Sequence, residues 1–219
     1  MSASFQYGCF ISFRHLPKIE RFVRQLKKDI KEELELYGVP LDVFLDEERI
    51  KIGDNFNAMI PNALCKSIVM VVVYVPAYFN ADKDYCTREF IAFIEHERRR
   101  LDEIKQKHPN ADHAKMHQVI TLLMRKDKTR ALPEELSKDR NLVDWSDYNN
   151  SALVSPLQFS KMKAYGPVVN QISEKIREIW QLAPQLDVLA NCSNHATLPD
   201  TKHPLFAKLT TNHPPPFPS

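Results

Sequence analysis

The sequence predicts an α/β fold built around a mostly parallel sheet. Strand-like apolar runs alternate with amphipathic helical segments along most of the 219 residues. One run, Ile68 to Val75, is apolar throughout and rich in β-branched residues, which is typical of a central parallel strand buried on both faces. Hydrophobic residues make up 43% of the chain, enough to bury one sizeable core.

The first part of the chain predicts three strands and two helices. Short β-rich runs indicate the strands Tyr7–Phe13, Leu41–Leu45 and Ile68–Val75. Between the first two, apolar side chains recur at helical spacing from Ile19 to Leu34, and Gly38 follows as a stop signal. A second helix is expected from Phe56 to Leu64, with Asp54 as its N-cap.

The second part continues the alternation and ends in a tail of different composition. A long helix is expected from Tyr85 to about Lys107, with Asp84 as its N-cap. Two further strands and a last helix follow at Val119–Met124, Leu142–Trp145 and about Pro156–Leu182. We therefore predict one domain over residues 5–183. Residues 184–219 are rich in Pro, Asn, Thr and His, and we expect this tail to be extended or disordered.

Charge and glycine content exclude several functional classes. Lys and Arg number 30 against 28 Asp and Glu, a balance that does not call for nucleic acid as a partner. The basic run within Glu97–Arg100 is interpreted as a solvated, mixed-charge helix face. No apolar run has the length of a bilayer span. The four glycines lie too far apart for a phosphate-binding glycine-rich loop.

The cysteines and histidines suggest neither a metal nor a disulfide framework. Four cysteines show no C-x-x-C pairing, and four histidines between residues 96 and 117 match no ligand spacing, so no metal is expected. Because no export signal is visible, we expect a cytoplasmic protein with reduced thiols. Cys86 lies on the apolar stripe of its helix and is expected to be a buried structural thiol.

A functional site is expected where the strand order reverses. In a sheet of order 2-1-3-4-5, ligands bind outside the carboxyl ends of strands one and three. The loop after the first strand, Phe13–His15, and the helix start, Tyr85–Glu89, should meet there, bordered by the loop Asp46–Arg49. Glu89 falls at the edge of the apolar stripe of its helix, where a carboxylate can face a crevice. The helix dipole alone would also explain an acid near a helix start.

Four motifs resemble those of TIR domains, in the same order and at fitting spacing. Tyr7–Arg14 (YGCFISFR) resembles the opening strand, Phe44–Gly53 resembles the BB loop, and Ile60–Pro76 resembles the helix and strand before the catalytic region. Tyr85–Phe90 (YCTREF) is similar to the signature Trp-Cys-x-x-Glu-Leu. The resemblance covers about residues 5 to 182, and the length is most like that of stand-alone bacterial TIR proteins of anti-phage signalling systems. Gly8 departs from the family's usual Asp.

The resemblance implies a fold, an activity and a set of site residues. The fold is a flavodoxin-like three-layer sandwich with a five-stranded, mostly parallel sheet of order 2-1-3-4-5. The implied activity is cleavage of NAD⁺, bound as substrate with no separate cofactor, and the essential Glu maps to Glu89. Further partners are other TIR protomers, assembled as a homo-oligomer through the BB-loop region, and a downstream effector that senses the product. The expected substrate-binding residues are Phe13, Arg14, Asp46, Glu47, Arg49 and Tyr85.

The chemistry of NAD⁺ cleavage is consistent with a single carboxylate. Nicotinamide leaves as a neutral base, so the general acid of ordinary glycosidases is not required. A negative group near the ribose stabilises the oxocarbenium charge that develops there. Phe13 and Tyr85 are candidates for stacking on the substrate rings, and Arg14 for a bidentate phosphate contact. Core packing of Phe13 and a solvated Arg14 are the plain alternatives.

Three functional hypotheses remain at this point. The first is an NAD⁺ glycohydrolase or cyclase, whose product is ADP-ribose or a cyclic ADP-ribose-type signal. The second is a non-catalytic TIR adaptor that acts through TIR–TIR assembly. The third is another flavodoxin-like enzyme that uses a carboxylate, such as a nucleoside deoxyribosyltransferase, but the BB-loop pattern of Phe44–Gly53 speaks against it.

Overall fold

The sheet has the predicted strand order and is parallel throughout. The computed structural model describes residues 5–45, 56–110, 112, 116–127, 131–138, 141–146, 165–184, 192 and 197–211. Within these residues a five-stranded sheet has the order β2-β1-β3-β4-β5, and every neighbouring pair is parallel. The strands are β1 (Tyr7–Phe13), β2 (Asp42–Phe44), β3 (Ser67–Tyr74), β4 (Val119–Leu123) and β5 (Asn141–Asp144).

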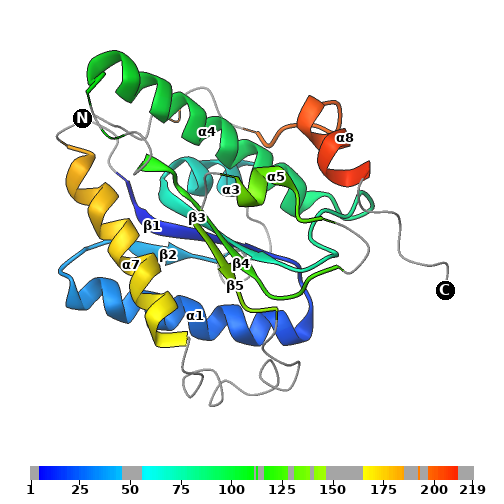
Figure 1. Cartoon of the computed structure of the whole chain (residues 1–219), viewed down its shortest axis with the longest axis horizontal. Helices are drawn as coiled ribbons and strands as arrows, with labels where there is room; N and C mark the ends of the chain where they lie inside the picture. Colours follow the sequence, from blue (N-terminus) through cyan, green and yellow to red (C-terminus); the bar gives the residue numbers. More distant parts are fainter. Residues whose placement is uncertain are drawn as a thin grey trace.

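Helices cover both faces of the sheet and complete a three-layer sandwich (Figure 1). On one face lie α1 (Pro17–Leu36) and α7 (Tyr165–Leu182), and on the other lie α3 (Phe56–Cys65) and α4 (Tyr85–Lys107). The short helices α5 (Glu134–Ser137) and α8 (Pro204–Thr211) pack on the α4 side. The flavodoxin-like fold class is therefore confirmed.

Alternation along β1 divides the core into two halves. Ile11 and Phe13 pack toward α1 and α7, whereas Phe10 faces α3 and α4. All eight residues of β3 are buried, as expected for a central strand covered on both sides. The position of Ser12 on the α4 face of this strand follows from the same alternation.

Most element boundaries agree with the sequence prediction to within two residues. β1 and α4 have the predicted bounds, and the helix predicted from about Pro156 is described from Tyr165 onward. Asp84 occupies the N-cap of α4, but its side chain makes no capping hydrogen bond. It lies instead 3.9 Å from Arg88, one turn into the helix.

The charged run on α4 is not a uniformly solvated face, which corrects the sequence interpretation. Arg98 and Arg99 are exposed, but Glu97 and Arg100 are buried. Arg100 Nη1 donates to the Ser67 carbonyl at 3.0 Å and to Gln118 Oε1 at 2.9 Å. Burial lowers the pKa of Arg100 to about 10, so the side chain stays cationic at neutral pH. It joins α4 to the residues that begin β3 and precede β4.

The C-terminal tail contains a packed helix, so the expectation of an extended or disordered segment is wrong for Pro204–Thr211. Phe206 and Leu209 of α8 are buried in the core half that contains α4. A main-chain contact adds to this packing, because Arg88 Nε donates to the Pro199 carbonyl at 2.7 Å. Phe206 and Leu209 are three positions apart, so they lie on the same side of α8 and pack together against α4.

A disulfide joins Cys65 to Cys192, with a Cα–Cα distance of 5.8 Å. The expectation that all thiols are reduced is therefore wrong for this pair. Cys9 and Cys86 are buried and are not part of a disulfide, and Cys86 is the buried thiol that its helical position predicted. Spacing along the sequence gives no signal for a bond across 127 residues, because only the fold brings α3 and the tail together.

None of the described helices has the length and hydropathy that a membrane span requires.

We expect two free thiols when the protein is purified without reductant and titrated after unfolding. Reduction should raise the number to four and lower the free energy of unfolding by about 5 kcal/mol, because the bond closes a loop of 127 residues. Urea unfolding before and after reduction measures the difference. The double variant Cys65→Ser/Cys192→Ser is the control, since its stability should not respond to reductant. Four titratable thiols before reduction would contradict the assignment.

Candidate active site

Glu89 lies in the interior, against the carboxyl end of β1. Its side chain is 4% exposed, and its Oε2 accepts a hydrogen bond from Ser12 Oγ at 2.7 Å. The neighbouring residues Phe90 and Phe93 of α4 are fully buried, so the helix is held firmly against the sheet. The carboxylate is therefore placed by the sheet as well as by its own helix, next to the predicted switch point between β1 and β3.

A chain of hydrogen bonds leads from Tyr78 through Ser12 to Glu89. Ser12 has one hydroxyl proton and gives it to the carboxylate, so the Tyr78 phenol donates to Ser12 Oγ, at 2.7 Å. Burial raises the pKa of Tyr78 well above its ordinary value, and the neighbouring Cys86 and Glu89 raise it further. Tyr78 thus stays protonated and donates to Ser12 Oγ, and Ser12 in turn donates its own proton to the Glu89 carboxylate.

Aromatic rings surround the Tyr78 end of this chain. The Tyr78 ring lies 4.9 Å from Phe79, edge to face, and Phe79 lies 5.4 Å from Phe90. Tyr74 contacts both residues of the turn, with ring centroids 6.1 Å apart in each case. Such apolar surroundings weaken dielectric screening, so a charge on Glu89 acts more strongly on a nearby cation than it would in water.

Two contacts bring the loop after β1 to the start of α4, as the sequence predicted. Cys86 Sγ donates to the Phe13 carbonyl at 3.2 Å, and Arg14 Nη1 donates to the Lys83 carbonyl at 3.0 Å. Tyr85, the first residue of α4, is 50% exposed. Arg14 and Tyr85 therefore lie at the same sheet edge as Glu89, and their roles in substrate binding stay predictions.

Phe13 is a core residue, which corrects its assignment to the substrate crevice. Its side chain is 2% exposed and belongs to the half of the core under α1 and α7. The physical reason is the alternation of β1: Ser12 faces Glu89, so the next side chain points to the opposite face. The predicted residues Asp46, Glu47 and Arg49 lie outside the described residues, and their roles also stay predictions.

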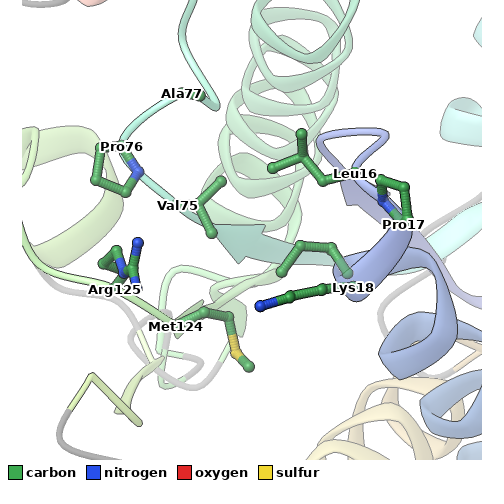
Figure 2. A pocket seen from close by; sticks show the side chains of 9 residues that line it. Leu16, Pro17, Lys18, Val75, Pro76, Ala77, Met124 and Arg125 are labelled. Carbon is green, nitrogen blue, oxygen red and sulfur yellow. The ribbon is translucent and has the colours of Figure 1, made fainter. Parts of the chain in front are cut away.

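A pocket of about 540 Å³ opens at the carboxyl ends of β3 and β4, on the α1 side of the sheet (Figure 2). Glu89 does not line it. Sequence reasoning missed this pocket, and also missed Ser12 and Tyr78 as partners of Glu89. The alternation of β1 could have found Ser12, but the turn that carries Tyr78 has no sequence signal of its own. Lining residues include Leu16, Lys18, Val75, Ala77, Met124 and Arg125.

The described residues hold no group of three or more His, Cys, Asp or Glu side chains arranged to bind a metal ion. His117 instead lies near a buried acid, with its Nδ1 3.8 Å from Glu97 Oε1. His203 similarly contacts Glu95 at 3.2 Å. The chemistry that this site offers is that of one buried carboxylate with a fixed hydrogen-bond donor, at the edge where parallel strands end.

The protein is a three-layer α/β sandwich whose parallel sheet has the order 2-1-3-4-5. A buried carboxylate lies beside the carboxyl end of β1, next to β3, where the strand order reverses and such sheets bind their ligands. Residues 9–155 match a family model described as TIR domain. Because this match spans more than half of the chain, the protein belongs to the TIR domain family. The match does not test the outer domain limits at residues 5 and 183, which stay predictions.

A related protein matches a shorter part of the chain than the family model does. The chain is 34% identical over 94 residues to a protein named NAD(+) hydrolase TcpA from Theionarchaea archaeon (strain DG-70-1). That match covers 43% of this chain and 26% of the relative, so it spans about a quarter of that protein's length.

Two solved structures are also similar. The TIR domain of the Toll-related receptor TRR-2 from Hydra magnipapillata is 20% identical with a TM-score of 0.45, over 79% of this chain and 98% of that one. The TIR domains of the activated Roq1 resistosome are 17% identical with a TM-score of 0.35, over 80% and 83%.

Ser12→Ala should destabilise the protein more than Tyr78→Phe. The serine substitution removes a donor from a buried carboxylate and an acceptor from a buried phenol, which should cost about 2–3 kcal/mol. Loss of the phenol hydroxyl leaves the bond between Ser12 and Glu89 in place and should cost about 1 kcal/mol. Urea unfolding measures both values. The reverse order would show that the chain of hydrogen bonds does not end on Glu89.

Proposed function

We propose that this protein hydrolyses NAD⁺ at the bond between nicotinamide and ribose, with Glu89 as the essential carboxylate. The observation that carries the proposal is the position of Glu89 beside the carboxyl end of β1, where Ser12 fixes its orientation with a 2.7 Å hydrogen bond. Membership of the TIR family and the partial match to a protein named NAD(+) hydrolase support it.

In the proposed reaction, the bond between ribose C1′ and the pyridinium nitrogen breaks, and its electron pair neutralises the ring. Positive charge then develops on the ribose, where the carboxylate of Glu89 stabilises it electrostatically. A water oxygen bonds to C1′ and releases a proton, so the products are ADP-ribose, nicotinamide and H⁺. If a nucleophilic atom of the substrate itself attacks C1′ in place of water, the products are a cyclic ADP-ribose, which contains one water molecule fewer than ADP-ribose, together with nicotinamide and H⁺.

Other residues would bind and enclose the substrate. Arg14 is suited to a phosphate contact and Tyr85, half exposed at the start of α4, to stacking on a ring. Asp46, Glu47 and Arg49 would contribute from the BB loop, supplied by a neighbouring protomer in a homo-oligomer. Enclosure by a second protomer would remove water from the site and strengthen the action of the carboxylate.

The proposed setting is cytoplasmic immune signalling, including anti-phage defence, with an effector that senses the product. The disulfide between Cys65 and Cys192 bears directly on this setting, because cytosolic proteins normally keep their thiols reduced. Thiol counting on protein trapped with an alkylating agent inside the producing cell tests the cytoplasmic location. A reduced pair in the cell agrees with it, and a bonded pair contradicts it.

A second candidate function is that of an adaptor that acts only through TIR–TIR assembly. The observation that favours it is the 4% exposure of Glu89, because a carboxylate enclosed by its own chain has little surface to offer a substrate. Concentration-dependent assembly without NAD⁺ turnover, even in concentrated wild-type protein, would support the adaptor and contradict the hydrolase.

Glu89→Gln should lower the rate of NAD⁺ consumption about 100-fold or more, the usual cost of removing an electrostatic stabiliser of the transition state. Glutamine keeps an acceptor for Ser12, so the fold should persist, and the circular dichroism spectrum checks this. Chromatography of NAD⁺ and its products measures the rate. Glu103→Gln, an exposed acid on the same helix, is the matched control and should turn over NAD⁺ at the wild-type rate. If both variants consumed NAD⁺ at the same rate, Glu89 would not be the essential carboxylate.

A further inference from the structure

The pocket beside α1 has the size and position of a small-molecule site. Its volume of about 540 Å³ lies within the range of ligand pockets, roughly 300–1,000 Å³. The walls come from the start of α1, the turn after β3 and the residues after β4 (Figure 2). These segments follow three adjacent parallel strands, at the sheet edge where open α/β folds bind their ligands.

The lining chemistry favours a ligand with an apolar part and an anionic part. Apolar side chains form most of the wall, among them Leu16, which is 41% exposed at the rim. Two cationic side chains, Lys18 and Arg125, come from different segments and contribute to the same pocket, and none of the described residues that line it is acidic. Figure 2 shows the Lys18 ammonium group beside Met124, with the Arg125 guanidinium group across from it. This combination is complementary to an aromatic ring that carries phosphate.

The pocket and Glu89 share two segments of backbone. Ala77 lines the pocket, and the next residue, Tyr78, donates to the serine that holds Glu89. Leu16 lines the pocket only four positions after Ser12, a separation of at most about 14 Å along an extended chain. The two features therefore lie on opposite faces of the sheet at its carboxyl edge, and these two short backbone segments connect them.

We propose that this pocket binds the adenine nucleotide half of NAD⁺, with adenine against the apolar wall and the phosphates on Lys18 and Arg125. The proposal rests on the proposed function, because it places the nicotinamide riboside half on the Glu89 side of the same edge. A dinucleotide that crosses the sheet edge at the point where strand order reverses matches the general geometry of open α/β sheets. Lys18 and Arg125 are then specificity-determining residues for the diphosphate.

Binding of ADP to the full chain tests the pocket without any turnover. Isothermal titration calorimetry should detect ADP binding to the wild type, and Lys18→Gln/Arg125→Gln should weaken it at least tenfold, because charge-assisted hydrogen bonds are lost. Lys28→Gln, an exposed lysine further along α1, is the matched control and should keep the wild-type affinity. Absence of ADP binding, or equal affinity in the double variant, overturns the proposal.

Steady-state kinetics then separates a substrate subsite from an independent nucleotide site. The double variant should raise the KM for NAD⁺ at least tenfold with kcat nearly unchanged, and ADP should inhibit the wild type competitively. Non-competitive inhibition, or a KM that does not respond, overturns the assignment to the substrate. If the wild type does not turn over NAD⁺, the proposed function fails, whereas calorimetry with ADP still decides whether the pocket binds an adenine nucleotide.

A second measurement does not depend on the variants folding. In the wild type labelled at its methionine methyl groups, ADP should shift the NMR signal of Met124, which lines the pocket, and leave that of Met70 in β3 in place. Movement of neither signal, or of Met70 alone, counts against the pocket as the nucleotide site.

Discussion

The hydrogen bond from Ser12 to Glu89 is the constraint on which the site depends. A carboxylate at 4% exposure is costly unless donors satisfy it, so α4 can pack against β1 in this register only if Ser12 faces the helix. Because the Ser12 proton is used in this bond, Ser12 Oγ accepts the proton of the Tyr78 phenol and thereby fixes its orientation. One serine therefore couples the first strand, the turn after the third strand and the helix that carries the acid.

The layers and the strand order could be predicted because they follow from burial patterns that repeat along the chain. β3 is recognisable as a central strand because all of its side chains are buried, and the apolar stripe of α1 extends from Ile19 to Leu34, about four helical turns. The predictions failed where a residue is buried although its type is usually exposed. Arg100 belongs to a charged run, yet its guanidinium group is buried and donates to three oxygen acceptors, on Cys65, Ser67 and Gln118. α8 is too short for periodicity to identify, and only the surface of α4 explains it.

The candidate site shows the same division between local and tertiary information. Motif resemblance located Glu89, and the β-strand period would have separated Ser12 from Phe13. Tyr78 and the pocket residue Arg125 could not be found in this way, since loops carry no repeating pattern and their positions are set by where the strands end. Packing bears on Gly8: a Cβ atom there would lie 2.9 Å from Leu34 Cδ1 and 3.1 Å from Ile176 Cγ2, so the Asp usual in the family would displace these two side chains.

The bond between Cys65 and Cys192 has a topological consequence. It closes a covalent ring that runs through β3, α4, β4, β5 and α7. A single backbone cut anywhere within that ring leaves both fragments attached to each other through sulfur. Limited proteolysis inside it will therefore pass unnoticed on a gel run without reductant, and the fragments will separate only once the ring is opened chemically.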